Sequence, residues 1–276
     1  MIRLTTGEHA GAALVTVALC LLLPWAARRR PGAWTHLVAR ALAILLVANL
    51  AFWEIATASA GSLTGANGLL LDVCPVTAAV AAAALWTRQP LLIELAYFWA
   101  CTGVVMGVIS PDAYYHFPSP FYFQFYITHS GAVIAAVFLV FGLRHTPRPG
   151  LLARVVPSTL ALIAIAGIAD VLTGANYVFL RDRRATGTLG DLLGPWPWYL
   201  MVGFILWVGS MWVLSLPFNR VRWRSATSPV SRLGSVWHRW TSSPLRTTTP
   251  LPGEFWPELA DSGDHLEESL SPVGVQ

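Results

Sequence analysis

Hydrophobic positions in this chain form long continuous runs, and polar positions fall mainly between them. A transmembrane helix needs about 20 consecutive apolar residues. Seven stretches approximate this requirement, at residues 10–27, 34–57, 69–87, 91–109, 121–143, 151–172 and 196–217. The pattern therefore predicts an all-α polytopic membrane protein, a bundle of about seven transmembrane helices.

The composition agrees with this prediction. Of the 276 residues, 55% are hydrophobic and only 12% are charged, whereas soluble domains carry roughly 25% charged residues. The net charge of +4 is interpreted as a signal of membrane topology, so we expect no nucleic-acid partner. Glu8 and His9 precede the first apolar run and Arg28 to Arg30 follow it, which is the reverse of a cleaved signal peptide.

The placement of arginine predicts the orientation. Arginines lie between the first and second runs, the third and fourth, the fifth and sixth, and after the seventh. The connections between the second and third runs and between the fourth and fifth have none, and the connection between the sixth and seventh is an exception, with Arg181, Arg183 and Arg184. By the positive-inside rule, we expect a multi-pass protein of the cell membrane with its N-terminus outside and its C-terminus in the cytoplasm.

The end of the chain differs in composition from the rest. We divide it into a seven-helix transmembrane domain, residues 1–217, and a cytoplasmic tail, residues 218–276. The tail is basic up to Pro250 and acidic from Leu251, and such charge blocks are usually disordered or solvated. Its basic half is suited to anionic lipid at the membrane surface.

Several polar side chains interrupt the apolar runs. Because ionisable groups are unfavourable in hydrocarbon, each is a candidate for function. The predicted topology places most of them in the outer half of the membrane, with Glu94 as the exception. The alternative interpretation is hydrogen bonding between helices, and it stays open for Glu54, Glu94 and Asp170. The full set is Asn49, Glu54, Asp72, Glu94, Gln124, His129, Asp170 and Asn176.

Cys74 has a context that the other cysteines lack. It lies between Asp72 and Pro75, and proline favours the first position of a helix, so we expect Cys74 at a helix N-cap. Free backbone N–H groups there stabilise a thiolate, and a histidine in the fifth run can accept the thiol proton. The alternative is that Cys74 is simply a small buried hydrophobe. Cys20 and Cys101 fit that alternative, and the three cysteines lack the spacing of a metal site or a disulfide framework.

The fifth run carries a polar stripe. Tyr122, Tyr126 and His129 are spaced i, i+4 and i+7, so they share one helix face, whereas Gln124 points elsewhere. We expect the stripe to form a pocket wall, with the proline-rich loop 111–120 as its rim; the alternative is a single hydrogen-bonded helix contact for His129.

The connection before the last run contains Asn176 and Asp191, together with Trp196 and Trp198. The tryptophans are typical of a membrane interface, and that role explains Asn176 and Asp191 less well.

These motifs together resemble the YwaF-like bacterial integral membrane proteins, a family related to the animal transmembrane protein 164. The resemblance runs from about the second run to the seventh. The pieces that carry it are Leu71-Asp-Val-Cys74, Glu94-Leu-Ala-Tyr-Phe-Trp99, Ser110-Pro-Asp112, Phe123-Gln-Phe-Tyr-Ile-Thr-His129, Asn176-Tyr-Val-Phe-Leu180 and Asp191-Leu-Leu-Gly-Pro-Trp-Pro-Trp-Tyr199. One departure is Asp72, which stands where the bacterial members commonly have His.

The resemblance implies a lipid acyltransferase in which Cys74 is the nucleophile and His129 the base. A phospholipid would donate the acyl chain and a lyso-lipid or another hydroxyl compound would accept it, without a cofactor or metal. Tyr126, Gln124 or Asn176 would donate hydrogen bonds to the oxyanion, with Asp72, Glu54, Glu94 and Asp191 as further supporting residues. Two alternatives remain: a lipid ester hydrolase with the same pair, and a transporter or binding protein that depends on the membrane acids.

Overall fold

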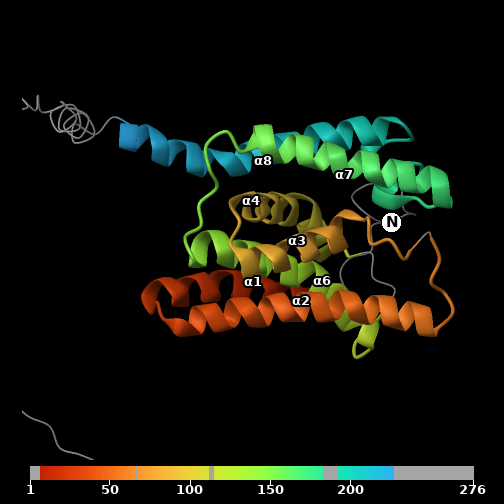
Figure 1. Ribbon diagram of the computed structural model, residues 1–276, viewed down its shortest axis with the longest axis horizontal. Coiled ribbons are helices and arrows are strands. Elements are labelled where there is room, and N and C mark those ends of the chain that lie inside the picture. The colour runs from red at the N-terminus through yellow and green to blue at the C-terminus, as the bar shows by residue number, and fades with distance from the viewer. Residues whose placement is uncertain (1–6, 66, 112–114, 183–191, 227–276) are drawn as a thin grey trace, which may run out of the picture. The chain divides into compact units, whose positions relative to one another are not determined.

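The computed structural model of the protein describes residues 7–65, 67–111, 115–182 and 192–226, with side chains as far as Phe218. The described residues form helices joined by connecting segments, which confirms the expected all-α class (Figure 1). The chain separates into one unit of residues 1–227 and a second of residues 228–276. The second unit lies outside the described residues, so the expected tail structure stays a prediction.

The helices of the first unit follow one another along the chain with few interruptions. In order they are α1 (Gly7–Arg29), α2 (Ala33–Ser59), α3 (Val73–Thr87), α4 (Pro90–Trp99), η1 (Ala100–Val104), α5 (Val105–Ile109), α6 (Pro120–Val137), η2 (Phe138–Gly142), α7 (Leu152–Thr173), η3 (Tyr177–Phe179) and α8 (Trp198–Ala226).

Two of these elements, η1 and η2, are π-helical turns inside longer spans. Helix α4 continues through η1 into α5, and α6 continues through η2. Counted this way, six helices are long and apolar enough to cross a membrane, and α3 is a shorter apolar helix of 15 residues. The described chain is therefore a multi-pass membrane bundle, close to the seven spans expected.

Helix α3 begins later than the apolar pattern predicts, at Val73 instead of residue 69. Leu70 has φ 48°, in the left-handed region, which a right-handed helix cannot continue through. Pro75 is tolerated two residues into the helix because N–H groups of the first turn have no partner within the helix. The helix ends at Arg88, which has φ 58°.

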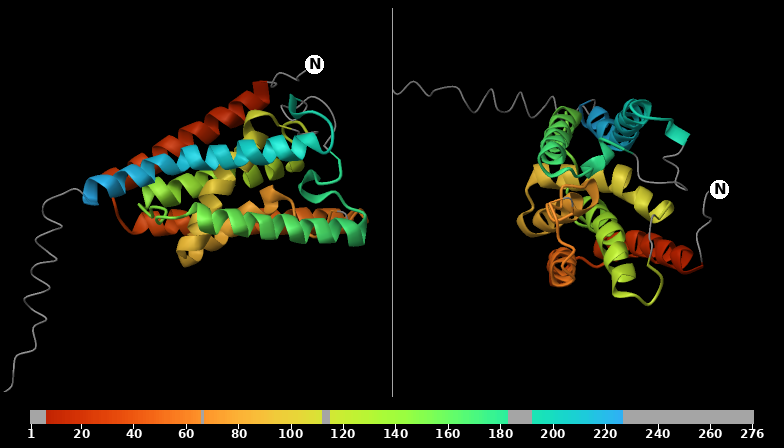
Figure 2. Two further views of the ribbon diagram at one scale, coloured as in Figure 1. Left: turned by 90° about the horizontal axis from the view of Figure 1, so that it is seen from above. Right: turned by 90° about the vertical axis from the view of Figure 1, so that its right-hand side faces the viewer.

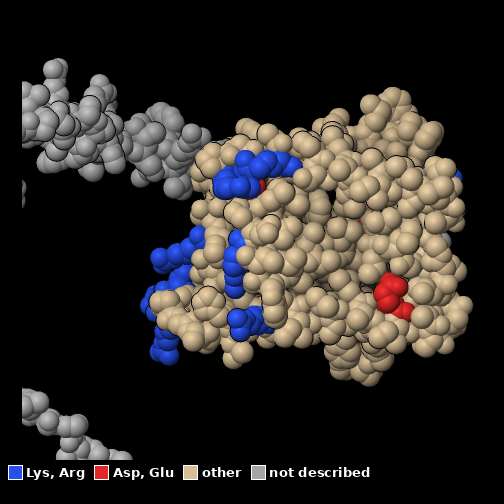
Figure 3. All heavy atoms as spheres, in the orientation of Figure 1, with Lys and Arg blue, Asp and Glu red and all other residues tan. Residues whose placement is uncertain are grey.

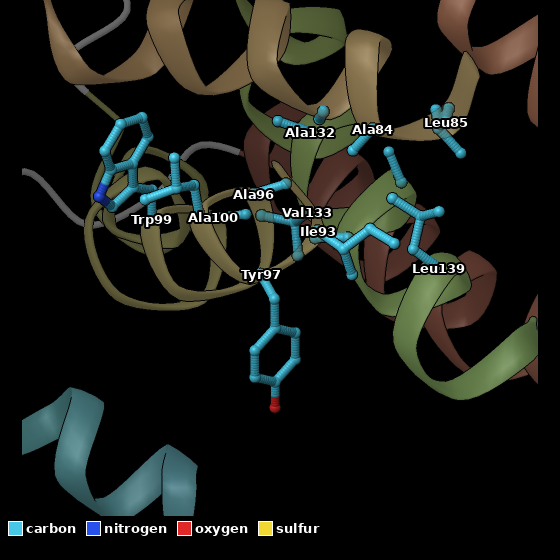
Figure 4. Packing of buried hydrophobic residues seen from close by; sticks show 14 of the residues in the cluster. Ala84, Leu85, Ile93, Ala96, Tyr97, Trp99, Ala100, Ala132, Val133 and Leu139 are labelled. Carbon is cyan, nitrogen blue, oxygen red and sulfur yellow. The ribbon is translucent and has the colours of Figure 1, made fainter. Parts of the chain in front are cut away.

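The centre of the bundle is formed by α3, α4 and α6, with α1 and α2 on one side and α7 and α8 on the other (Figures 1 and 2). Alanines dominate the central contacts: Ala81 and Ala84 of α3, Ala96 of α4 and Ala135 of α6 are completely buried. Small residues let helix backbones approach closely in membranes. Figure 4 shows Ala84, Ala96 and Ala132 among larger buried side chains such as Ile93, Val133 and Leu139.

Large apolar side chains cover much of the outside of the bundle. Leu14 on α1 is 70% exposed, and Val171 and Leu172 on α7 are 74% and 78% exposed. An apolar surface of this kind is unfavourable in water and suits lipid tails. These side chains are therefore in contact with membrane lipid.

The charged side chains are distributed unevenly between the two ends of the bundle. Arginines gather at the end where α1 meets α2, α3 meets α4, and η2 leads toward α7 (Figure 3). We call this the arginine end. The asymmetry follows the pattern read from the sequence; which end faces the cytoplasm stays a prediction.

Candidate active site

Cys74 lies in the first turn of α3, half-buried, at the end of the bundle opposite the arginine end. The helix begins at Val73 and its N-cap is Asp72, so the expectation that Cys74 is the N-cap was wrong by two residues. The reason is that Val73 already has a helical backbone ahead of the proline. Cys74 still lies among first-turn N–H groups that have no partner within the helix, where the helix dipole favours negative charge.

Although Asp72 is the N-cap residue by position, its side chain does not bond the first turn of α3. The carboxylate instead bonds the connection after α7. Its Oδ1 accepts a hydrogen bond of 2.9 Å from the backbone N–H of Val178. Val178 and Phe179 both have φ 56°, a conformation that is costly for side chains other than glycine. The carboxylate thus fixes a strained segment against the turn that carries Cys74.

Tyr177 ties the same segment to two further parts of the chain. Its N–H donates to Asp170 Oδ1 over 2.7 Å, and its hydroxyl donates to the Gly65 carbonyl over 2.9 Å. The hydroxyl also accepts from the Leu69 N–H at 3.1 Å. The end of α7, η3 and the connection before α3 therefore form one hydrogen-bonded unit beside Cys74.

Asn176 organises the turn that follows. Its Nδ2 donates to the Asp182 carbonyl over 2.6 Å, and its Oδ1 accepts from the Arg181 N–H over 2.9 Å. The polar atoms of this predicted site residue are thus used within its own loop. Asp191, the other candidate from this connection, lies outside the described residues.

His129 is on α6, with its ring stacked on Phe125 at a centroid distance of 4.1 Å. Its Nδ1 lies 2.8 Å from the Phe125 carbonyl oxygen. A carbonyl oxygen can only accept, so Nδ1 carries a hydrogen, and in the neutral ring Nε2 is the basic nitrogen. The ring is in the tautomer that a general base acting through Nε2 requires.

The η1–α5 segment contacts both the first turn of α3, which carries Cys74, and the ring of His129. A Cβ added at Gly107 would lie 2.8 Å from His129 Nε2, so the imidazole lies directly against this glycine. A Cβ added at Gly103 would lie 3.6 Å from Val73 Cγ1, next to Cys74 in the chain. The two glycines are four positions apart, about one helical turn. Cys74's turn and His129 therefore pack on the same helix, about one turn apart.

Tyr126 and Gln124 do not join His129. The Tyr126 hydroxyl lies 2.6 Å from His9 Nδ1, on α1. The Gln124 side chain donates to Thr128 at 3.2 Å, and the backbone carbonyl of Gln124 accepts from Asn49 on α2 at 3.2 Å. Gln124 is about 140° from His129 around the helix, as expected for a residue that points elsewhere.

A polar cluster around Glu8 was not identified from the sequence. The Glu8 carboxylate pairs with His116 and accepts from the Phe117 N–H at 2.9 Å. The backbone carbonyl of Glu8 accepts from the Tyr122 hydroxyl at 2.9 Å. His9 lies beside it. The cluster joins α1 to the loop before α6, and its only sequence signal is a Glu-His pair just before the first apolar run.

Glu8, His9 and His116 are also residue types that bind metals, and their ligand atoms lie within 4.8 Å of one another. His9 Nε2 is 4.0 Å from Glu8 Oε1. Neighbouring ligands of tetrahedral zinc are roughly 3.4 Å apart. Glu8 bonds His116, whereas His9 bonds Tyr126 through Nδ1, so the three residues would have to move to hold such an ion.

The membrane acids outside this region have separate roles. Glu94 is buried at the arginine end, where Arg148 and Arg154 both bond its carboxylate at distances of 2.8 to 3.2 Å. It is roughly 13 Å along its helix from Gly103, so the structure does not bring it to Cys74. Glu54 Oε1 and Asp170 Oδ2 are buried without a hydrogen-bond partner among the described residues.

A groove of about 410 Å³ lies between α2 and α6. Pro118 and Pro120 border it, together with Phe123, Gln124 and Ile127. The proline-rich loop was expected to be the rim of the pocket that contains His129. It borders this groove instead, and Gln124 and Ile127 lie about 140° and 160° around α6 from His129. The groove is on the other face of that helix.

The apolar spans define a multi-pass membrane protein, in which the first turn of α3 and the ring of His129 both pack on the η1–α5 segment. The sequence model of the TMEM164 family matches residues 4–215. The chain therefore belongs to the TMEM164 family, as the resemblance of its motifs indicated. The match covers α1 to most of α8 and stops before the predicted tail. No curated protein and no solved structure gives a significant match to the chain.

Proposed function

We propose that this protein is a membrane lipid acyltransferase that uses Cys74 as nucleophile and His129 as general base. The observation that carries the proposal is that Val73, the neighbour of Cys74 in the chain, and the His129 ring both pack on the η1–α5 segment. Gly103 lies against Val73 and Gly107 against the imidazole. The hydrogen bond from Nδ1 to Phe125 leaves Nε2 as the basic nitrogen, on the side of the ring that faces Gly107.

In the first half-reaction, His129 Nε2 takes the proton from the Cys74 thiol. The thiolate attacks the carbonyl carbon of a phospholipid acyl ester and forms a tetrahedral oxyanion. When the intermediate collapses, the bond from carbon to the ester oxygen breaks. The imidazolium returns the proton to that oxygen, so a lyso-lipid leaves and the acyl chain remains on Cys74 as a thioester.

In the second half-reaction, an acceptor hydroxyl gives its proton to Nε2 and attacks the thioester carbon. The thiolate then leaves and regains the proton. The net change is one ester bond broken and one formed, and no cofactor enters the balance.

The oxyanion is assigned to the first turn of α3. Backbone N–H groups at a helix N-terminus are suited to developing negative charge, and such donors contribute several kcal/mol to catalysis. Asp72 bonds Val178 and leaves this turn uncapped by a side chain. Tyr126, Gln124 and Asn176 serve less well as donors, because their polar atoms bond His9, Thr128 and the Asp182 carbonyl.

Transfer to water instead of a hydroxyl lipid would make the same pair a hydrolase. Purified protein in proteoliposomes, supplied with a phospholipid carrying a labelled acyl chain and an unlabelled lyso-lipid, distinguishes the two. We expect labelled product phospholipid that depends on lyso-lipid and is lost in Cys74→Ala but kept in Cys20→Ala. Free fatty acid as the only product, whatever the lyso-lipid concentration, would make the protein a hydrolase.

We also propose that the arginine end faces the cytoplasm, which places Cys74 and His129 in the outer half of the membrane. Reporter fusions after residue 217 and in the connection between α2 and α3 test this. A cytoplasmic signal from the second fusion would reverse the orientation.

A further inference from the structure

A second hollow lies at the arginine end, away from Cys74 and His129. It has a volume of about 270 Å³ and is formed where α3 meets α4 and where the chain leaves η2. Its polar wall consists of Arg88, Arg144, His145, Thr146 and Arg148. We call this hollow the arginine pocket. The acyl-transfer chemistry does not use it.

Arg88 lines this pocket and also has an unmet hydrogen bond. Its Nη1 is buried and lacks a hydrogen-bond partner among the described residues. Burial also lowers the pKa of its guanidinium. A buried donor without an acceptor is destabilising, and a buried cation needs a counter-charge. An anion entering the hollow would supply both the acceptor and the charge.

Arg148 is held at the pocket by Glu94. The carboxylate accepts from the Arg148 Nε at 3.0 Å and from its backbone N–H at 2.9 Å. The same carboxylate also bonds Arg154, so one negative charge is shared by two guanidinium groups. Glu94 therefore positions Arg148 without neutralising the surrounding positive charge.

The backbone holds two of the arginines in an unfavourable conformation. Arg88 has φ 58° and Arg144 has φ 60°, in the left-handed region that is uncommon outside glycine and asparagine. Strained positions of this kind gather at ligand sites. Here both strained residues contribute guanidinium groups to one hollow.

The depth of the arginine pocket narrows the class of ligand. Its lining residues lie at or within a few positions of three helix ends: α3 ends at Thr87, α4 begins at Pro90 and η2 ends at Gly142. Helix ends of this kind lie at the level of lipid headgroups. Guanidinium groups match the geometry of phosphate oxygens and bond them in pairs. A phosphate at the membrane surface fits the charge, the donors and the location.

We propose that the arginine pocket binds the phosphate of an anionic membrane lipid, with Arg88 and Arg144 as principal donors. Arg148 contributes a third guanidinium, positioned by Glu94. The lipid's acyl chains lie along the exposed apolar surface of the neighbouring helices. This lipid is a bound partner at the arginine end and is separate from the substrate at Cys74.

The test measures binding of monomeric dioctanoyl phosphatidic acid to the purified full-length protein in phosphatidylcholine nanodiscs. Dioctanoylglycerol, which has the same chains without phosphate, and inorganic phosphate are the comparison ligands. We expect saturable binding of the phosphatidic acid, no binding of the diacylglycerol, and at least tenfold weaker binding of inorganic phosphate. Arg144→Gln, at an exposed position, and Arg88→Gln should each weaken the phosphatidic acid Kd about tenfold.

Arg29→Gln is the matched control, because Arg29 is exposed at the arginine end and does not line the pocket. It should leave the Kd unchanged. An equal loss in Arg29→Gln would show general attraction to the basic surface and overturn the proposal. Equal affinity for inorganic phosphate would show that the ligand is a free phosphate instead of a lipid. Absence of any binding would overturn the proposal. If Arg88→Gln fails to fold, Arg144→Gln alone decides the outcome.

Discussion

Gly107 lies so close to the His129 ring that a Cβ in its place would be 2.3 Å from the imidazole Cδ2. That separation is far inside van der Waals contact, so any side chain at position 107 must displace the ring. Because residue 107 has no side chain, the His129 ring can pack directly against the η1–α5 segment.

Gly107→Ala should therefore lower acyl transfer by at least tenfold, because the displaced imidazole no longer reaches the thiol. The matched control is Gly103→Ala, whose Cβ would meet Val73 Cγ1 at an ordinary 3.6 Å. Both proteins should elute like the unmodified protein; Gly103→Ala should keep its melting temperature, and Gly107→Ala should lose only the few degrees expected for an overpacking cost of about 1–3 kcal/mol. Equal activity in Gly107→Ala would show that the position of the imidazole does not matter.

The contact between Asp72 and Val178 should stabilise the turn that carries Cys74. Asp72→Ala removes the acceptor for the Val178 N–H, and loss of a charge-assisted hydrogen bond costs about 1.5–3 kcal/mol. We expect a lower melting temperature and faster proteolysis near residue 178. Asp72→Asn keeps an acceptor oxygen and should resemble the unmodified protein.

Adding Val178→Gly to Asp72→Ala should restore part of the loss, because glycine accepts a positive φ without strain. Failure of this rescue, with Asp72→Asn as damaging as Asp72→Ala, would point to a role for the negative charge itself.

Glu94 should contribute to the stability of the folded protein and not to the binding of the lipid substrate. Glu94→Ala leaves Arg148 and Arg154 without their shared carboxylate. Removing one partner of a buried pair costs about 3 kcal/mol at the lower end of the usual range, and the lower end applies because both arginines are partly exposed. The melting temperature should fall, while the folded fraction keeps its KM for lipid. A changed KM with an unchanged melting temperature would contradict this assignment.

His145 should make the arginine end sensitive to acid. Burial and the neighbouring charge of Arg88 lower its pKa below the ordinary 6.5, and Arg144 and Arg148 line the same hollow. The folded protein thus prefers the neutral imidazole, so this contribution to stability is present above pH 6.5 and is lost as the pH falls through the folded pKa.

His145→Gln should flatten the dependence of melting temperature on pH below 6.5. An NMR titration of the imidazole adds a second readout, because phosphatidic acid in the arginine pocket should raise the His145 pKa. An unchanged acid dependence in His145→Gln would contradict the assignment.

Apolar run length and arginine spacing were enough to predict the class of fold and the uneven distribution of charge. The start of α3 was missed because it depends on the left-handed backbone of Leu70, which an apolar leucine does not signal. Helical periodicity correctly separated Gln124 from His129, since that separation is fixed by position along one helix.

Contacts between residues far apart in the chain could not be predicted from the sequence. The pairing of His9 with Tyr126 joins residues 117 positions apart, and no local pattern predicts it. Glu94 was a candidate because an acid in a membrane helix suggests function, but its arginine partners come from another part of the chain. The contacts of Val73 and His129 with the η1–α5 segment depend on Gly103 and Gly107, and a glycine in an apolar run gives no signal of which side chain will pack against it.

The central claim is that Cys74 carries the acyl group, and peptide mass spectrometry of the protein after brief incubation with phospholipid tests it most directly. We expect a hydroxylamine-sensitive acyl adduct on the peptide containing Cys74, absent in Cys74→Ala and kept in Cys20→Ala. His129→Asn, whose amide can still donate to the Phe125 carbonyl but has no basic nitrogen, should form it at least a hundredfold more slowly. An adduct of normal yield in Cys74→Ala would contradict the account.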